Sequence, residues 1–93
     1  FSNLIIDREA YKVFINGEER SLPRKEFELL YLLASKPGKV FKREHILEKV
    51  WGYEVVVGDR TIDVHIRKLR EKLGDPFFKT VKGVGYTFVQ PPN

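Results

Sequence analysis

Residues 59–73, DRTIDVHIRKLREKL, constrain the fold of this chain more than any other stretch. Successive residues of an α-helix are about 100° apart, so the four aliphatic residues of this stretch fall on one narrow stripe. They are Ile62, Ile66, Leu69 and Leu73. Such a stripe is typical of a helix held against a hydrophobic core. Asp59 is a suitable N-cap and Gly74 a suitable end, so we predict one amphipathic helix between them.

The opposite face of this predicted helix is mainly cationic. It carries Arg60, Val64, Arg67 and Lys68, with Glu71 further along. Residues 1–59 hold ten Lys/Arg and ten Asp/Glu, whereas residues 60–93 hold seven and three and so supply the whole net charge of +4. This asymmetry indicates an anionic partner for the C-terminal third of the chain. The simpler alternative is a solvated basic helix.

Val64 favours the DNA major groove as the place where this face binds. An aliphatic side chain among outward cations can contact a thymine methyl group, while Arg and Lys can donate to guanine. Arg60, Thr61, Arg67 and Arg70 lie on or beside the same face and could reach phosphates. A scattered surface valine, and an Asp63–Arg67 surface pair at i,i+4 spacing, are the alternatives without a function.

Several classes of protein are excluded by what the sequence lacks. The 93 residues contain no cysteine, which excludes disulfides and cysteine-ligated zinc, and no apolar run approaches the roughly 20 residues of a membrane span. His45 and His65 are twenty residues apart without a carboxylate pattern beside them, so we predict no metal or other cofactor. No catalytic constellation is visible, and we expect no enzyme. Because no methionine is present, we expect that the chain was cut from a longer protein with an N-terminal partner domain.

The first part of the chain predicts a small antiparallel sheet of three or four strands. Strand-like runs occupy residues 4–6, 13–15 and 18–21. Asn16-Gly17 lies between the second and third, and is the strongest hairpin signal in the chain because a type I′ turn needs positive φ at both central residues. We expect this sheet to act as a scaffold.

Two further helices and a hairpin are predicted. Helical spacing of apolar residues covers residues 23–35 and 43–51, and residues 77–81 and 86–90 alternate as strands around the loop Lys82-Gly83-Val84-Gly85. Residues 52–59, GYEVVVGD, link the second and third helices and are too apolar for a passive solvated turn. They either cover the core or form a docking surface for a protein partner.

The order and spacing of four motifs resemble one known family over essentially the whole chain. KEFELLYLLASKPGKV, REHILEKVWG, RTIDVHIRKLREKL and TVKGVGYTF are similar to the winged-helix effector domain of OmpR/PhoB-type bacterial response regulators. The resemblance implies an α+β fold over residues 1–93, a winged helix-turn-helix with an N-terminal antiparallel sheet, a three-helix core and a C-terminal hairpin wing.

The function that the resemblance implies is sequence-specific binding of double-stranded DNA by a transcription factor of a two-component system. Members similar to this chain work in the bacterial cytoplasm and follow a phosphorylatable receiver domain that a sensor kinase controls. They bind as tandem dimers on direct repeats and can contact RNA polymerase. The alternative is a winged-helix module that binds protein rather than DNA.

Residue roles also follow from the resemblance. Base-facing positions are occupied by Asp63, Val64 and Lys68. Positions that contact the DNA backbone are occupied by Trp51, Arg60, Thr61, His65, Arg67, Arg70, Thr80 and Tyr86. Lys82 matches the wing-tip residue that enters the minor groove. The loop that can meet RNA polymerase matches Tyr53, Glu54, Val55, Val56, Val57 and Gly58.

This chain departs from the family pattern at both helix starts and at two cations. Pro23 and Lys42 stand where a capping Ser or Thr is common, so we expect weaker side-chain caps there. Lys68 and Lys82 stand where Arg is common. Lysine is a point charge without the planar two-pronged geometry of arginine, so we expect different base discrimination at these two positions.

Overall fold

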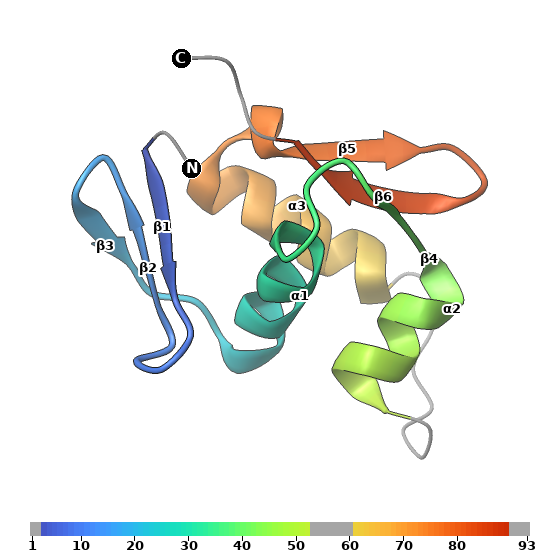
Figure 1. The fold of residues 1–93 in the computed structure, drawn as a ribbon, viewed down its shortest axis with the longest axis horizontal. Coiled ribbons are helices and arrows are strands. Elements are labelled where there is room, and N and C mark those ends of the chain that lie inside the picture. Colours follow the sequence, from blue (N-terminus) through green and yellow to red (C-terminus); the bar gives the residue numbers. More distant parts are fainter. Residues whose placement is uncertain (1–2, 53–60, 90–93) are drawn as a thin grey trace.

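Two three-stranded antiparallel sheets lie on either side of the helices in the computed structural model, which describes residues 3–52 and 61–89 (Figure 1). The elements in chain order are β1 Leu4–Asp7, β2 Lys12–Ile15, β3 Glu18–Arg20, α1 Arg24–Ala34, β4 Val40–Lys42, α2 Arg43–Ile46, η1 Leu47–Trp51, α3 Thr61–Leu73, η2 Asp75–Phe77, β5 Phe78–Val81 and β6 Gly85–Phe88. This arrangement confirms the predicted fold class, a winged helix with a leading antiparallel sheet.

The N-terminal sheet has the order β1-β2-β3. Strands β2 and β3 form a hairpin that turns at Asn16-Gly17, as predicted. Asn16 has φ of 51° and Gly17 has φ of 83°, so both central residues of the turn are in the left-handed region that a type I′ turn requires. Alternate residues Leu4, Val13 and Ile15 point into the core, which leaves the opposite face of the sheet to solvent.

Helix α1 is buried on more than one side, with Phe27, Leu29 and Leu30 all in the core. Pro23 precedes it, and no side chain caps its first turn. Glu26 is only 3% exposed, and its Oε1 accepts a hydrogen bond of 2.8 Å from Nζ of Lys72 in α3. This pair joins α1 to α3 because an unpaired buried carboxylate would be costly.

The second helix spans the predicted residues but changes its winding halfway. After α2 the chain widens into the π-helical segment η1, in which the N–H of Gly52 donates to the Leu47 carbonyl at 3.0 Å. Gly52 has φ of 87°, and Lys25 of α1 donates to the Val50 carbonyl at 2.8 Å. A contact from another element therefore satisfies a carbonyl at the end of this helix.

The second sheet has the order β4-β6-β5, so the predicted C-terminal hairpin carries a third strand. No strand was predicted at Val40–Lys42, but these residues pair with β6. Gly85 makes this pairing possible, since a Cβ on it would lie 1.9 Å from the carbonyl oxygen of Phe41. We refer to this sheet and its β5–β6 turn as the wing.

Helix α3 runs between the two sheets behind α1, with its aliphatic stripe in the core (Figure 1). The stripe residues are Ile62 and Ile66 at 1% exposure, Leu69 at 0% and Leu73 at 7%. Gly74 ends the helix with φ of 120°, and its N–H donates to the Arg70 carbonyl at 2.8 Å. The predicted anchoring of this helix is confirmed, while Asp59 lies outside the described residues.

Candidate nucleic-acid interface

Helix α3 turns an exposed face with two cations and one aliphatic side chain away from its buried stripe. Val64 is 39% exposed, and Arg67 and Lys68 are also exposed. Neither cation forms an ion pair with any residue in the described part of the chain, so the alternative Asp63–Arg67 pair does not form. Both positive charges are available to an anionic partner.

The wing presents a third cation at its tip. Val81, Lys82, Gly83 and Val84 make a four-residue turn closed by the N–H of Val84, which donates to the Val81 carbonyl at 2.9 Å. Gly83 has φ of 77°, the positive value that the third residue of a type II turn requires. This geometry leaves Lys82 exposed at the tip.

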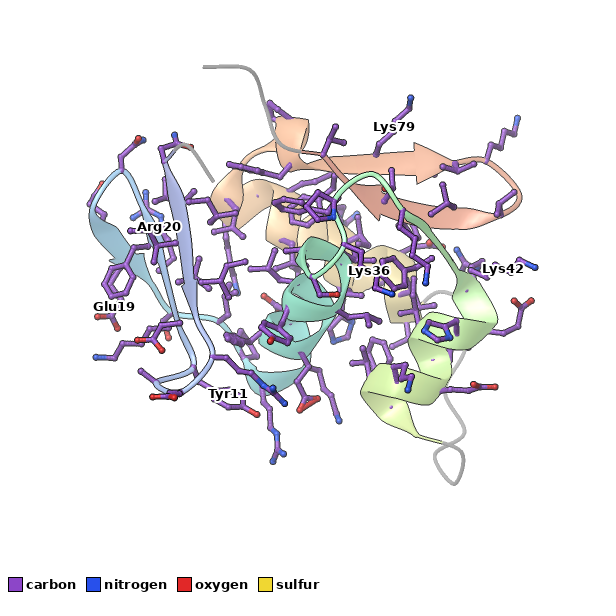
Figure 2. The ribbon with its side chains drawn as sticks, viewed as in Figure 1. Tyr11, Glu19, Arg20, Lys36, Lys42 and Lys79 are labelled. Carbon is purple, nitrogen blue, oxygen red and sulfur yellow. The ribbon has the colours of Figure 1, made fainter. Side chains whose placement is uncertain are left out.

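Further lysines extend from the strands of the same sheet. Lys42 of β4 and Lys79 of β5 are exposed and point away from it (Figure 2). The wing is therefore cationic beyond its tip as well.

Arg70 joins α3 to the wing. Its Nη2 donates to Oγ1 of Thr80 in β5 at 2.9 Å and to the Phe78 carbonyl at 3.3 Å. Arg70 and Thr80 were each predicted to contact the DNA backbone, and the structure brings their two side chains together. Their bond sets the distance between the helix and the strand that carries the wing tip.

His65 and Trp51 join α3 to the end of η1. Their rings meet edge to face with centroids 5.0 Å apart, and both side chains are half-buried. Nδ1 of His65 lies 2.8 Å from the carbonyl oxygen of Thr61, which makes Nδ1 the nitrogen that donates. The other ring nitrogen, Nε2, can donate to an external acceptor such as a phosphate oxygen only when both ring nitrogens carry a proton.

Asp63 accepts hydrogen bonds from two other elements. Arg43 at the start of α2 approaches it with both terminal nitrogens, Nη1 to Oδ1 at 2.8 Å and Nη2 to Oδ2 at 3.3 Å. The hydroxyl of Tyr86 in β6 donates to the same Oδ1. The ring of Tyr86 is buried, at 5% exposure.

Both partners of Asp63 have shifted pKa values. Burial raises the pKa of Tyr86, and the bond to the Asp63 carboxylate raises it further because a tyrosinate would repel that charge. The hydrogen bond to Asp63 raises the pKa of Arg43, which keeps the guanidinium charged. The cluster therefore holds one full cation, one carboxylate and one neutral phenol.

Arg43 is the residue of this region that sequence analysis did not identify. It is twenty residues before Asp63, and no periodic pattern joins the starts of two different helices. The only available signal was the motif REHILEKVWG, in which Arg43 is the first residue. Among the predicted site residues, Arg60 and the loop Tyr53–Gly58 lie outside the described residues.

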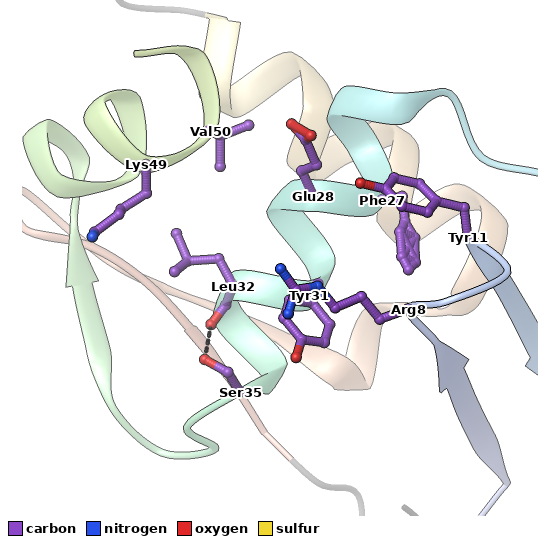
Figure 3. Close-up of a pocket in the computed structure, with 9 residues that line it drawn as sticks. All are labelled: Arg8, Tyr11, Phe27, Glu28, Tyr31, Leu32, Ser35, Lys49 and Val50. Carbon is purple, nitrogen blue, oxygen red and sulfur yellow. Dashed lines mark hydrogen bonds between the residues drawn. The ribbon is translucent and has the colours of Figure 1, made fainter. Parts of the chain in front are cut away.

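A separate hollow lies between the β1–β2 turn, α1 and η1, with a volume of about 260 Å³ (Figure 3). Tyr11 stacks on Phe27 with centroids 4.8 Å apart, and the guanidinium of Arg8 lies 5.0 Å from the ring centre of Tyr31. Tyr11 has φ of 54°, an uncommon value for an aromatic residue. The residues that line this hollow therefore lie on elements other than α3 and the wing tip.

Residues 3–52 and 61–89 contain no group of three or more His, Cys, Asp or Glu side chains that could hold a metal ion. Within the same ranges, every helix is too short or too polar to cross a membrane.

Comparison with known proteins places this arrangement in a family. Residues 17–88 match the family described as "Transcriptional regulatory protein, C terminal". The transcriptional regulatory protein YclJ of Bacillus subtilis is 49% identical over 87 residues, which cover 89% of this chain and 38% of YclJ. The transcriptional regulatory protein ResD of Bacillus subtilis is 48% identical over 94 residues, or 95% of this chain and 39% of ResD. The chain thus spans about two-fifths of the length of these relatives.

Solved structures agree with this placement. The response regulator DrrB of Thermotoga maritima, an OmpR/PhoB homologue, superimposes with a TM-score of 0.88 at 39% identity, covering 97% of this chain and 43% of DrrB. The DNA-binding domain of Klebsiella pneumoniae RstA, solved in complex with the RstA box, gives 0.85 at 34% identity and covers 96% and 93%. The chain therefore belongs to the OmpR/PhoB-type C-terminal DNA-binding domains of transcriptional regulatory proteins.

Proposed function

We propose that this domain binds double-stranded DNA sequence-specifically, as the effector domain of a two-component response regulator that controls transcription. Helix α3 enters the major groove, and the wing reaches the adjacent minor groove with Lys82. The observation that carries the proposal is the face of α3, where Arg67 and Lys68 flank the exposed Val64 on a helix anchored by four buried residues. The groove accepts a helix of this size, and cations on both sides of Val64 match the phosphates along its walls.

Single residues take three roles in this proposal. Val64 and Lys68 contact base edges, where Lys68 donates as a point charge rather than with the fork of an arginine. Arg67 and Thr61 contact phosphates, and His65 does so through Nε2 when both of its ring nitrogens carry a proton. Arg60, predicted to do the same, lies outside the described residues.

The partners of the whole protein extend the proposal. A receiver domain under a sensor kinase precedes the effector domain, since the relatives of this family are more than twice as long as this chain. Two copies bind as a tandem dimer on direct repeats in the bacterial cytoplasm. Residues 53–58 contact RNA polymerase, a role that rests on the resemblance alone.

The proposal is tested by selecting bound sequences from a random duplex pool and measuring the affinity for the selected duplex. Arg67→Glu is expected to lower that affinity about 30- to 100-fold, because it removes a charged hydrogen bond and adds repulsion at a phosphate. The side chain points away from the core, so the melting temperature should stay unchanged.

Arg24→Glu is the matched control. It makes the same charge change on α1, at a side chain that is 76% exposed. The control should bind within about twofold of the wild type, since loss of an exposed ion pair contributes little. Unchanged DNA affinity in Arg67→Glu would contradict the placement of α3 in the groove and favour the alternative, a module that binds protein.

A further inference from the structure

We propose that Arg43, Asp63 and Tyr86 form a positioning cluster that sets the orientation of α3 relative to the wing. In this role Asp63 supports DNA binding by holding the two DNA-contacting elements in register, instead of contacting a base itself. The inference rests on the proposed function, because it assigns these residues a part in DNA binding.

Three elements that are distant in sequence meet at one carboxylate. Arg43 begins α2, Asp63 lies in the first turn of α3, and Tyr86 lies in β6. The two bonds from Arg43, at 2.8 and 3.3 Å, form the planar fork that arginine makes with a carboxylate. The Tyr86 hydroxyl donates to the same oxygen as the shorter of these bonds. A bidentate pair resists rotation as well as separation, so it fixes an angle between elements.

Arg43 also contacts the wing through its backbone. Its N–H donates to the Val84 carbonyl at 3.4 Å, a bond that takes the place of a side-chain cap at the start of α2. The preceding residue, Lys42, pairs with Gly85 of β6. One residue therefore holds the wing turn with its main chain and α3 with its side chain.

The cluster and the Arg70–Thr80 bond tie α3 to the wing at two separated points. Asp63 and Arg70 are seven residues apart, or about two helical turns. The first contacts β6 through Tyr86, and the second contacts β5 through Thr80. Two attachments fix both the distance and the tilt of the helix. Because the arrangement is already formed in the free domain, less conformational entropy is lost when α3 and the wing bind adjacent grooves.

Charge gives a second reason for the pairing. A bare carboxylate on the exposed side of α3 would repel DNA phosphates, and the side chain of Asp63 is 46% exposed. Arg43 neutralises it at hydrogen-bond distance. Both oxygens of Asp63 already accept hydrogen bonds, and turning the carboxylate toward a cytosine amino group would leave Arg43 and Tyr86 without this acceptor.

The test is a double-mutant cycle on DNA specificity. Arg43→Gln, Asp63→Asn and the double variant are measured on the duplex that the wild type selects and on a scrambled duplex of equal length. The ratio of the two affinities removes the general effect of net charge. Each single variant is expected to lower this ratio about tenfold, as for loss of a charged hydrogen bond. The double variant should lower it about as much as one single variant, because the two residues act as a unit.

A second measurement separates positioning from base contact. Selection is repeated with Asp63→Asn, and Val64→Ala serves as the matched change at a proposed base-contacting position. Positioning predicts the wild-type base preference at every position of the site with weaker discrimination throughout. Val64→Ala should instead change the preference at one or two positions.

Two controls keep the test decisive. Arg24→Gln removes a comparable exposed ion pair, to Glu28 on α1, and should leave the affinity ratio unchanged. If Arg43→Gln does not fold, Tyr86→Phe tests the same cluster by removing a single hydroxyl, with an expected loss of about threefold or more in the ratio.

The outcomes for the cluster and for the proposed function differ. The cluster would be overturned if the losses in the affinity ratio of the two single variants multiplied in the double variant. It would also be overturned if Asp63→Asn changed the base preference at a single position of the site. Either result would leave the proposed DNA binding intact. A wild-type domain that enriches no duplex would overturn the proposed function.

Discussion

Most of the predicted DNA-contacting side chains in residues 3–52 and 61–89 fall into two groups, according to what they already touch within the domain. Val64, Arg67, Lys68 and Lys82 are exposed on α3 and at the wing tip. Six others have side-chain contacts within the domain, namely Trp51, Asp63, His65, Arg70, Thr80 and Tyr86. Trp51 packs against His65, Arg70 bonds to Thr80, and Asp63 accepts from Tyr86. A residue with an internal partner can contact DNA only within the geometry that this partner permits. The second group therefore holds the binding surface in a fixed shape, while the side chains of the first group extend from it toward DNA.

Tyr86 makes a prediction about stability at high pH. Burial and the bond to Asp63 raise its pKa in the folded domain above the unfolded value of about 10. A group with a raised folded pKa contributes stability that is fully present below the unfolded pKa and is lost as pH rises through the folded pKa. We therefore expect the wild type to lose its advantage in melting temperature over Tyr86→Phe as pH rises above 10.

The measurement is thermal unfolding of both proteins from pH 8 to 11. Tyr31→Phe is the control, since Tyr31 is 37% exposed on α1, away from the cluster. Its difference from the wild type should not follow the same trend. A wild-type advantage over Tyr86→Phe that stays constant across this range would contradict the prediction.

The position of each element that we propose to contact DNA depends on a neighbouring element. Helix α3 is held by α1 through Glu26 and Lys72, and by η1 through Trp51. The β5–β6 hairpin of the wing is held by β4, which precedes α2 directly. The second helix thus joins the two elements proposed to contact DNA, and of its own residues only Trp51 is a predicted contact.

Gly85 is the point where the wing depends most on close backbone approach. In Gly85→Ala the new Cβ would lie 1.9 Å from the Phe41 carbonyl oxygen, and a backbone atom cannot move aside as a flexible side chain can. We expect a loss of about 3 kcal/mol or more in the free energy of unfolding, measured by urea denaturation.

Gly83→Ala is the matched change in the same hairpin. A Cβ there meets nothing within 4 Å, so its cost comes from φ of 77° alone and should be about 1 kcal/mol. Equal losses in the two variants would show that β4 and β6 separate readily, against the close pairing described here.

The domain as a whole is a neutral scaffold attached to a basic binding region. Its N-terminal 59 residues carry balanced charge, and the excess lies from Arg60 onward, in the part of the chain that holds α3 and the wing strands β5 and β6. Segregation of this kind favours approach of DNA in one orientation.

Salt dependence tests this electrostatic arrangement. If the domain neutralises roughly six phosphates, its affinity should fall about a thousandfold between 50 and 200 mM salt, because each neutralised phosphate releases condensed counterions. Lys82→Ala should reduce the slope of log affinity against log salt by about one, whereas Lys36→Ala, on the α1–β4 connection, should leave it unchanged. Affinity that does not respond to salt would contradict the cationic face as the binding surface.

The local features of this domain were predictable from the sequence because backbone geometry sets their periods. The stripe from Ile62 to Leu73 follows from about 3.6 residues per turn, and the first hairpin follows from the tolerance of Asn16 and Gly17 for positive φ. Those patterns also located Val64 and Arg67 on the exposed face. The motifs that carry the family resemblance supplied the roles of the remaining residues.

Contacts between side chains of different elements became visible only in the folded domain. The pairing of Asp63 with Arg43 and Tyr86, the addition of β4 to the wing and the widening of η1 depend on how separate elements dock. Docking is set by packing and by the need to satisfy buried polar groups, and neither leaves a periodic trace in one sequence. Residue periodicity is therefore enough to predict a helix with a buried stripe and a cationic face, while contacts between elements set how that helix is held beside the wing.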